Sequence, residues 1–344
     1  MSRSKNVWLP VVVVLGVSVL ISLLIVFAGM DVLGWGKDPD DVTLRVDSAN
    51  VREISKELKK EGVIKSRYLF TVYEKLYRNV GKVKNAFGVG RFKLNKSMAY
   101  NEIIRNLTQE PLKTVTVDFL PGVTVRDISK ELAKAKVCKE GEFFDALNNG
   151  CFDYEFLRQI PANKLRFNRY EGYFCPDKYE FYVGEAPKMV IDRFFENFEL
   201  KCKEYSKEFE NTKLTLDEVI ILASLVEKEA GGGDETGNVA SVFVNRLNGK
   251  SVYPKLNSDP TIRYIELYIK PYIDTQNQEM YDAYDTYKCN GLPVGPICNP
   301  SIKSIKAVLN PPETDYYYFF TDKDGKYHWA KNLNEHNASL RKYL

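Results

Sequence analysis

Two glutamates separated by a single lysine close a long apolar segment in the second half of the chain. The segment runs from Thr215 to Gly233 and reads T-L-D-E-V-I-I-L-A-S-L-V-E-K-E-A-G-G-G, so Glu227 and Glu229 come just before three glycines. A carboxyl group at the end of a buried helix can have a raised pKa, which suits a general acid near neutral pH. This pair is therefore the first candidate for acid–base chemistry.

The residues before the glutamates predict a helix that is buried on all sides. Thr215 and Glu218 have the spacing of a capping box, and the apolar residues from 219 to 226 leave no polar face. Positions i and i+2 lie about 200° apart on a helix, so Glu227 and Glu229 cannot share a face. We expect one of them to face a cleft and the other to face solvent or a structural partner. The plainer alternative is a solvated helix end, although a carboxylate is unfavourable near the negative end of the helix dipole.

Composition limits the classes of function that the chain can serve. It has 344 residues, of which 44% are hydrophobic, enough for two compact domains after an anchor. The 49 basic and 46 acidic side chains nearly balance, which argues against a nucleic-acid partner because such proteins carry a strongly basic face. The 22 tyrosines suit a groove that stacks on sugar rings, and they equally suit an ordinary core.

The N-terminal region predicts a membrane anchor. Residues 11–30 are uncharged and nearly all apolar, and about 20 such residues span a bilayer. Arg3 and Lys5 precede this run and Asp31 follows it, so the positive-inside rule places the N-terminus in the cytoplasm and the remainder outside.

A cleaved signal peptide is the alternative to an anchor, because residues 26–28 (V-F-A) resemble a cleavage site. The apolar run is longer than the hydrophobic region of a usual signal peptide, which favours an uncleaved anchor. We therefore predict a cytoplasmic tail at 1–6, a transmembrane signal anchor at 7–30 and a linker at 31–41.

Cysteine and histidine usage indicates possible disulfides and no metal site. An exported chain with an even number of cysteines permits disulfides, and Cys138/Cys151 and Cys289/Cys298 are close in sequence, although sequence does not determine the pairing. The chain has no C-x-x-C motif and only two histidines, His328 and His336, so we predict no zinc site and no cofactor. The six cysteines are Cys138, Cys151, Cys175, Cys202, Cys289 and Cys298.

A strand-to-helix pattern occurs twice in the first half of the chain. A strand from Val42 leads into a helix at 51–62, and a strand at 115–120 leads into V-R-D-I-S-K-E-L at 125–132, which nearly copies 51–58. Helices at about 68–79 and 98–108 lie between the copies. The pattern predicts a small α+β module. The alternative interpretation is that the two copies only share a sequence pattern common at strand-to-helix junctions and are not a true repeat.

From about residue 138 the pattern indicates helices and loops, followed by a hairpin. An aromatic stretch at 169–182 has no clean period and is expected to be a loop. The other expected elements are a short helix at 152–160, a long amphipathic helix at 188–209, helices at 238–247 and 301–309, a helix begun by Pro260 and capped by Asp259, a strand pair around D-K-D-G (322–325), and a helical tail.

Several of these segments occur together in a known family. The motifs are E-G-Y-F-C-P-D, A-S-L-V-E-K-E-A, V-F-V-N-R-L, D-P-T, Y-D-T-Y, G-L-P-V-G-P-I-C-N-P and E-H-N, in this order. Together they resemble the MltG/YceG-like endolytic murein transglycosylases over roughly residues 42–344. Each motif alone is weak, and their order makes the resemblance specific. Two positions depart from it: the family often has Asn where Asp285 stands, and Arg where Thr236 stands.

The resemblance implies a fold, a location and an activity. The fold would be α+β, with a membrane anchor, a LysM-like module at 42–112, and a mixed helical YceG-like catalytic domain at 113–344 that ends in a β-hairpin. The protein would be single-pass in the cytoplasmic (inner) membrane with its catalytic domain extracytoplasmic or periplasmic. It would act in cell wall growth and glycan strand termination, on peptidoglycan glycan strands and with peptidoglycan synthases as candidate partners.

The implied reaction cleaves the MurNAc–GlcNAc β-1,4 bond and leaves 1,6-anhydro-MurNAc ends, with Glu229 as the catalytic residue. One carboxyl group suffices, because the sugar's own C6 hydroxyl attacks C1 and gains from proximity. A muramidase-type hydrolase would need a second acid, about 5–5.5 Å away for retention or 6.5–9.5 Å for inversion. Asp259 and Glu171 are candidates for that acid. An inactive glycan-binding scaffold is the third possibility.

The remaining candidate residues would bind substrate. Each has an ordinary alternative, namely capping a helix, packing in the core or satisfying a structural hydrogen bond. The substrate-binding candidates are Glu171, Tyr173, Asn245, Asp259, Thr261, Tyr287 and His336.

Overall fold

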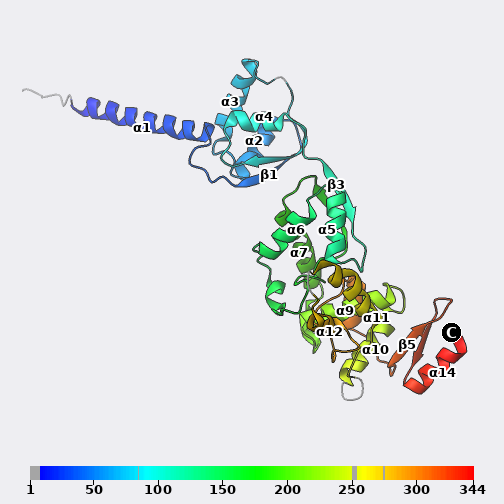
Figure 1. The fold of residues 1–344 in the computed structure, drawn as a ribbon. Coiled ribbons are helices and arrows are strands. Elements are labelled where there is room, and N and C mark those ends of the chain that lie inside the picture. The colour runs from blue at the N-terminus through cyan, green and yellow to red at the C-terminus, as the bar shows by residue number, and fades with distance from the viewer. Residues whose placement is uncertain (1–7, 84, 250–253, 274–275) are drawn as a thin grey trace, which may run out of the picture. The chain divides into compact units, whose positions relative to one another are not determined.

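The computed structural model describes residues 8–83, 85–249, 254–273 and 276–344. The chain divides into two compact units, Met1–Lys113 and Thr114–Leu344 (Figure 1). Within the described residues the strands form three antiparallel two-stranded sheets among many helices, which confirms the predicted α+β class.

The first unit begins with an apolar helix, α1, which spans Trp8–Val32. An 18-residue stretch within Val12–Val32 has a mean hydropathy of 2.9, and the helix is long and apolar enough to cross a membrane. The end of this helix is fixed to the rest of the unit, since buried Asp31 pairs with Lys37 at 2.9 Å and accepts hydrogen bonds from the backbone of Lys65 and Ser66. The expected linker therefore does not begin at Asp31.

The remainder of the first unit packs helices against one strand pair. Strands β1 (Asp41–Val46) and β2 (Gly90–Asn95) are antiparallel, with Leu44 opposite Phe92. The core between sheet and helices contains Leu44, Ile54, Leu58, Phe70, Phe92 and Tyr100. The helices are α2 (Val51–Lys60), α3 (Arg67–Asn79) and α4 (Tyr100–Leu107), close to the predicted ranges.

The second unit also opens with a strand and a helix. Strand β3 (Thr114–Asp118) pairs antiparallel with β4 (Lys178–Tyr182), and α5 (Val125–Lys134) follows β3. The two sequence copies thus lie in different units and in different sheets. This arrangement favours a sequence pattern common at strand-to-helix junctions over a true repeat. The prediction of a loop throughout 169–182 is wrong for residues 178–182, which form strand β4. Tyr179 and Phe181 of this strand are buried in the core.

The helices of the second unit surround one central helix, α9 (Leu216–Ala230). The predicted helix at 188–209 is two helices, because the backbone leaves the helical conformation at Tyr205. The other elements are α6 (Glu140–Asn149), η1 (Glu155–Gln159), α7 (Pro187–Lys203), α8 (Ser206–Asn211), α10 (Thr236–Asn248), α11 (Asp259–Tyr264), η2 (Ile265–Ile269), η3 (Lys270–Tyr272), α12 (Gln278–Tyr284), α13 (Ile302–Leu309), β5 (Tyr318–Thr321), β6 (Tyr327–Ala330) and α14 (Leu333–Tyr343).

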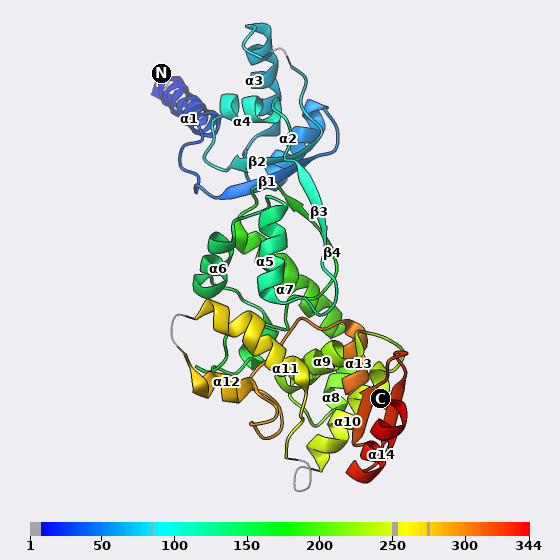
Figure 2. The same cartoon turned by 45° about the vertical axis from the view of Figure 1, so that its right-hand side comes forward.

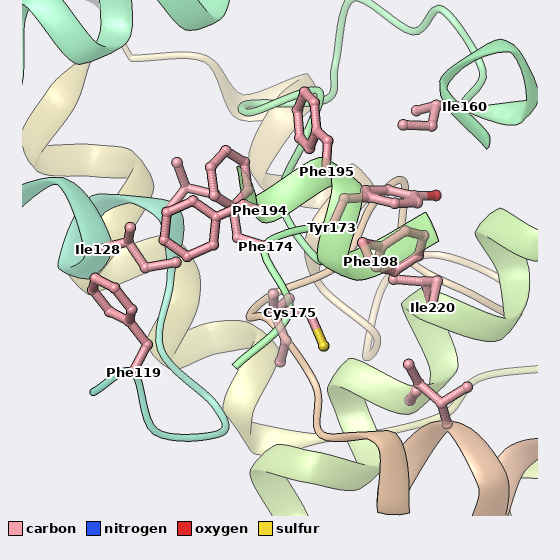
Figure 3. Packing of buried hydrophobic residues seen from close by; sticks show 14 of the residues in the cluster. Phe119, Ile128, Ile160, Tyr173, Phe174, Cys175, Phe194, Phe195, Phe198 and Ile220 are labelled. Atoms are coloured by element: carbon pink, nitrogen blue, oxygen red, sulfur yellow. The ribbon is translucent and has the colours of Figure 1, made fainter. Parts of the chain in front are cut away.

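Helix α9 is buried as predicted. Its residues 219–227 are all buried, and α10, α11 and α13 pack against it (Figure 2). An aromatic cluster that includes Phe174, Phe194, Phe195 and Phe198 fills the adjoining core (Figure 3). The Thr215–Glu218 capping box is present at the start of the helix, so local and tertiary signals agree on where α9 begins.

The hairpin and the cysteines complete the second unit. Strands β5 and β6 pair antiparallel, with Phe319 opposite Trp329, which confirms the predicted C-terminal hairpin. All six cysteines are free thiols in this structure, with Cys138, Cys175 and Cys298 buried and Cys151 exposed.

Candidate active site

Glu229 lies in the last turn of α9, where the buried helix reaches the surface. The helix ends at Gly231, whose φ of 56° is left-handed, and Gly232 follows with φ 68°. Glycine adopts this conformation without a steric penalty, so the chain can leave the helix directly after the catalytic candidate. Glu229 is partly exposed, and its side chain therefore sits at the border between core and solvent.

A serine outside the helix holds the Glu229 carboxyl group. Ser258 Oγ donates a hydrogen bond to Glu229 Oε1 at 2.6 Å. Ser258 is only 1% exposed, and its backbone is fixed on both sides: its N–H donates to Thr286 Oγ1 at 2.8 Å, and its carbonyl accepts from Thr261 Oγ1 at 2.7 Å. Asn257, with a left-handed φ of 49°, sets the turn into this position.

The surroundings of Glu229 favour its protonated form. Burial raises the pKa of the Glu229 carboxyl, and the negative charge of Asp259 raises it further. The hydrogen bond from Ser258 and the positive charge of Arg246 act in the opposite direction, and the pKa remains above its ordinary value. A carboxyl group with a raised pKa and access to solvent can donate a proton near neutral pH.

A second carboxylate and a tyrosine lie beside Glu229. Tyr287 Oη donates to Asp259 Oδ1 at 2.6 Å. Burial raises the pKa of Tyr287 to about 12, with contributions from the charges of Asp259 and Glu229, so the phenol stays protonated. Asp259 is exposed and occupies the first turn of α11, whose N-cap is Ser258. The expectation that Asp259 caps this helix is therefore wrong by one residue.

The two positions that depart from the family pattern lie close to this group. Asp285 is 8% exposed, and its Oδ1 accepts from the backbone N–H of Tyr287 at 2.9 Å. It therefore helps to place the tyrosine that holds Asp259. Thr236 is buried in the first turn of α10, where its Oγ1 donates to the carbonyl of Gly233 at 2.6 Å. The threonine fixes the glycine turn after Glu229.

The C-terminal hairpin supports the site from another side. Tyr327 Oη donates to the backbone carbonyl of Glu229 at 2.9 Å. Asn245 Nδ2 donates to the carbonyls of Thr314 and Tyr316, both at 2.9 Å, so this predicted sugar ligand fixes the chain that leads into β5. Arg246 Nε donates to the carbonyl of Tyr317 at 2.7 Å.

His336 lies in α14 and packs against aromatic residues of the hairpin. Its ring centre is 5.3 Å from that of Tyr318 and 5.7 Å from that of Phe320. Burial lowers the pKa of His336, and the positive charge of Arg246 lowers it further, so the imidazole is neutral at pH 7. Its predicted role at the substrate stays a prediction.

Three other predicted substrate ligands lie inside the protein. Glu171 is 2% exposed and accepts hydrogen bonds from the backbone N–H of Val125 and from the side chains of Tyr264 and Asn299. Tyr173 is fully buried and donates to Asp217, and Thr261 is fully buried and supports Ser258. Sugar contact with these three side chains would require the core to open.

Glu227 points away from Glu229 into a structural contact. It is 4% exposed, and its Oε2 accepts from Ser301 N at 2.9 Å, Ser301 Oγ at 2.6 Å and Ser304 Oγ at 2.7 Å. These donors form the first turn of α13, so Glu227 joins α9 to α13. Glu227 therefore has the structural partner that was expected for one of the two glutamates, whereas the expectation that the other faces a cleft stays a prediction.

Sequence reasoning missed two members of the site, Ser258 and Tyr327. Ser258 directly precedes the D-P-T motif, and this adjacency was the available signal. Tyr327 lies in β6, and the pairing of β6 with β5 brings this tyrosine to α9. The residue types of the strand carry no signal for that contact. Within the described ranges no group of three or more His, Cys, Asp and Glu side chains is arranged to hold a metal ion.

Comparison with known proteins points to one family. Residues 46–342 match the model of the YceG-like family. An endolytic murein transglycosylase of Bacillus subtilis (strain 168) is 29% identical over 305 residues, which cover 86% of this chain and 82% of that protein. One from Streptococcus pneumoniae serotype 2 is 27% identical over 328 residues, with 87% of this chain and 57% of that protein covered, so the chain spans just over half of the streptococcal relative.

A solved structure is similar over most of the chain. The crystal structure of a yceG-like protein from Listeria monocytogenes matches with a TM-score of 0.54 and 25% sequence identity, and the match covers 88% of this chain and 100% of that one.

Proposed function

The chain belongs to the YceG-like family, and from this membership we propose that it cleaves the glycan strands of peptidoglycan as an endolytic lytic transglycosylase. Relatives named endolytic murein transglycosylases support the reaction class. The observation that carries the proposal is the Glu229 carboxyl group, which is partly exposed at the end of a buried helix, hydrogen-bonded by Ser258 and held at a raised pKa.

In the proposed reaction Glu229 acts first as an acid and then as a base. Protonated Glu229 donates its proton to the glycosidic oxygen while the bond from MurNAc C1 to that oxygen breaks, and the GlcNAc residue leaves with a 4-hydroxyl group. The Glu229 carboxylate then accepts the proton of the MurNAc C6 hydroxyl as that oxygen bonds to C1. A 1,6-anhydro ring forms, and Glu229 is again protonated.

The neighbouring residues support these two steps in different ways. Ser258 orients the carboxyl group and stabilises its ionised form, which exists between the two proton transfers. Asp259 favours the protonated form that must begin the reaction. Tyr287 fixes Asp259 through its 2.6 Å hydrogen bond. The opposing effects keep the proton affinity of Glu229 suited to both donation and recovery.

Hydrolysis by a muramidase-type mechanism is the second candidate, and the carboxylates near Glu229 favour it. Asp259 is exposed beside Glu229, and Asp285 accepts from the backbone N–H of Tyr287, the residue whose phenol donates to Asp259. A carboxylate in this region could activate a water molecule for attack on C1. The two reactions give different products, so product analysis separates them.

The deciding experiment digests purified glycan strands and identifies the released ends by mass spectrometry. Lytic cleavage is expected to give 1,6-anhydro ends, which are lighter by one water than the reducing ends left by hydrolysis. Reducing ends would assign the enzyme to the muramidases, and the Asp259→Asn and Asp285→Asn variants would then show which carboxylate is required. Absence of any cleavage would favour the inactive glycan-binding scaffold.

Substitution of the two glutamates tests the assignment of the acid. Glu229→Gln should lower turnover by at least roughly 10²-fold, because general acid–base catalysis contributes about 10²–10⁴-fold. Glu227→Gln is the matched control on the same helix and should retain turnover. Circular dichroism of both variants establishes that they are folded. Near-normal turnover by folded Glu229→Gln would contradict the mechanism.

We further propose roles for the first unit. Helix α1 would anchor the protein in the cytoplasmic membrane, with its N-terminus inside the cell and the second unit outside. Residues 42–112 would be a LysM-like glycan-binding module, supported by the strand–helix–helix–strand order of β1, α2, α3 and β2. The enzyme would terminate strands during cell wall growth, close to peptidoglycan synthases. Deletion of the module should weaken binding to purified sacculi, and unchanged binding would leave the module as a spacer.

A further inference from the structure

A cleft with two basic side chains adjoins the candidate active site. It has a volume of about 300 Å³ and lies between the end of α9 and the segment formed by α11 and η2. The lining side chains that matter here are Lys228, Arg263, Tyr264, Leu267 and Tyr268.

The chain itself places this cleft next to the reactive groups. Lys228 directly precedes Glu229, and Pro260, which also lines the cleft, directly follows Asp259. Helix α11 packs against α9 (Figure 2), so the cleft and the Glu229–Asp259 pair share the same two helices. The residues that line the cleft therefore directly adjoin both reactive carboxyl groups along the chain.

The positive charges of the cleft are not neutralised by carboxylates. Lys228 Nζ donates to the backbone carbonyl of Gly122 at 3.0 Å, which leaves its charge uncompensated. Arg263 is exposed, and among the described residues it has no ion-pair partner. Lys270, at the start of η3, is by contrast paired with Glu266 of η2. The two unpaired cations make the cleft a site for an anion.

The acidic groups near the cleft are already bound within the protein. Asp127 Oδ2 accepts from Tyr268 Oη at 3.0 Å and from Thr124. Glu171 lies buried beneath Tyr264 and accepts its phenol at 3.2 Å. An incoming carboxylate therefore meets Lys228 and Arg263 without displacing an internal anion.

The remaining wall of the cleft is apolar and aromatic. The rings of Tyr264 and Tyr268 are stacked, with centres 5.7 Å apart. Leu267 is 59% exposed at the rim. A ligand that combines a carboxylate with aliphatic groups matches these walls better than a bare inorganic anion or a neutral sugar does.

We propose that the Lys228–Arg263 cleft binds a carboxylate of the peptide attached to the MurNAc residue next to the cleaved bond. The inference rests on the proposed function and names its substrate class: glycan strands that still carry their peptides. MurNAc bears its peptide on the lactyl group, so the peptide leaves the glycan close to the reacting C1. Arg263 carries an unpaired positive charge in this cleft, so it would determine the specificity of the enzyme for peptide-bearing over peptide-free strands.

The test compares two substrates with the full chain in detergent. One is purified uncrosslinked glycan strands with their peptides, and the other is the same strands after an amidase has removed the peptides. Wild-type kcat/KM should be roughly tenfold or more higher on the peptide-bearing strands, the size of one charge-assisted hydrogen bond. This preference should appear mainly in KM and should fall with rising salt, because ions screen an exposed charge.

Charge reversal at Arg263 supplies the decisive variant. Arg263→Glu should abolish the preference and Arg263→Lys should retain most of it. Arg169→Glu, at an exposed arginine of the same unit outside the cleft, should keep the wild-type preference. Equal wild-type kcat/KM on the two substrates, or a preference that survives Arg263→Glu, would overturn the inference. If wild-type enzyme cleaves neither substrate, the proposed function fails first and the inference fails with it.

Discussion

Replacement of Glu227 should test whether the first glutamate of the E-K-E triplet is structural. Its Oε2 accepts three hydrogen bonds from Ser301 and Ser304, and the side chain is 4% exposed. Ser301 is the N-cap of α13, so the Glu227 carboxylate also lies at the positive end of that helix. Such a carboxylate stabilises the helix through both hydrogen bonding and the helix dipole.

The expected magnitudes follow from these contacts. A hydrogen bond to a charged group contributes about 1.5–3 kcal/mol, and the three bonds share one oxygen and are not additive. Glu227→Ala removes all three and should destabilise the second unit by about 3–5 kcal/mol. Glu227→Gln keeps an acceptor in place and loses only the charge, so it should cost about 1–2 kcal/mol.

The assay is denaturant unfolding of the full chain in detergent, combined with hydrogen exchange at the amides of residues 301–309. Both variants should unfold at lower denaturant, in the order Ala before Gln, and exchange in α13 should accelerate. A free energy of unfolding within 0.5 kcal/mol of wild type for Glu227→Ala, roughly the effect of an ordinary surface substitution, would refute the structural role. A folded Glu227→Gln with the turnover of Glu229→Gln would instead show that the two faces of α9 are misassigned.

Four further substitutions or fusions give independent checks. Ser258→Ala removes a hydrogen bond that favours ionised Glu229, so the pKa of Glu229 in the pH profile of kcat/KM should rise; an unchanged profile would exclude an electrostatic role for the serine. Burial raises the pKa of Glu171 from 4.5 to about 8, so its contribution to stability is complete below pH 4.5 and is lost as the pH rises through 8. Glu171→Gln should flatten this part of the thermal-unfolding profile, and an equally steep profile would contradict the assignment. Asp31→Ala leaves Lys37 buried without its partner and should destabilise the first unit by about 3–5 kcal/mol in denaturant unfolding, whereas a neutral effect would show that α1 is not fixed there. A reporter enzyme fused after residue 40 should be active only outside the cytoplasm; cytoplasmic activity would overturn the proposed topology.

Features that depend on neighbouring residues were predictable from the sequence. The capping box, the apolar run and the glycines define α9 within a few residues, since helix ends are set by hydrogen bonds between groups three or four positions apart. The separation of Glu227 from Glu229 follows from helix period alone. The hairpin and the apolar α1 were predictable for the same reason, because alternation and length are local properties.

The partners of each side chain were decided only by tertiary structure. Glu229 meets Ser258, which is 29 residues away in sequence, and Tyr327, which is 98 residues away. Glu171 and Tyr173 belong to a motif with the residue types of a binding loop, and the fold places both in the core. Residue type and spacing carry no record of which distant segments pack together, because that choice depends on the packing of all the apolar faces at once. The local sequence therefore predicts that the Glu229 carboxyl group lies at the end of a buried helix. The pKa of Glu229, the serine that orients it and the basic cleft beside it arise only when α9, α11 and the hairpin meet.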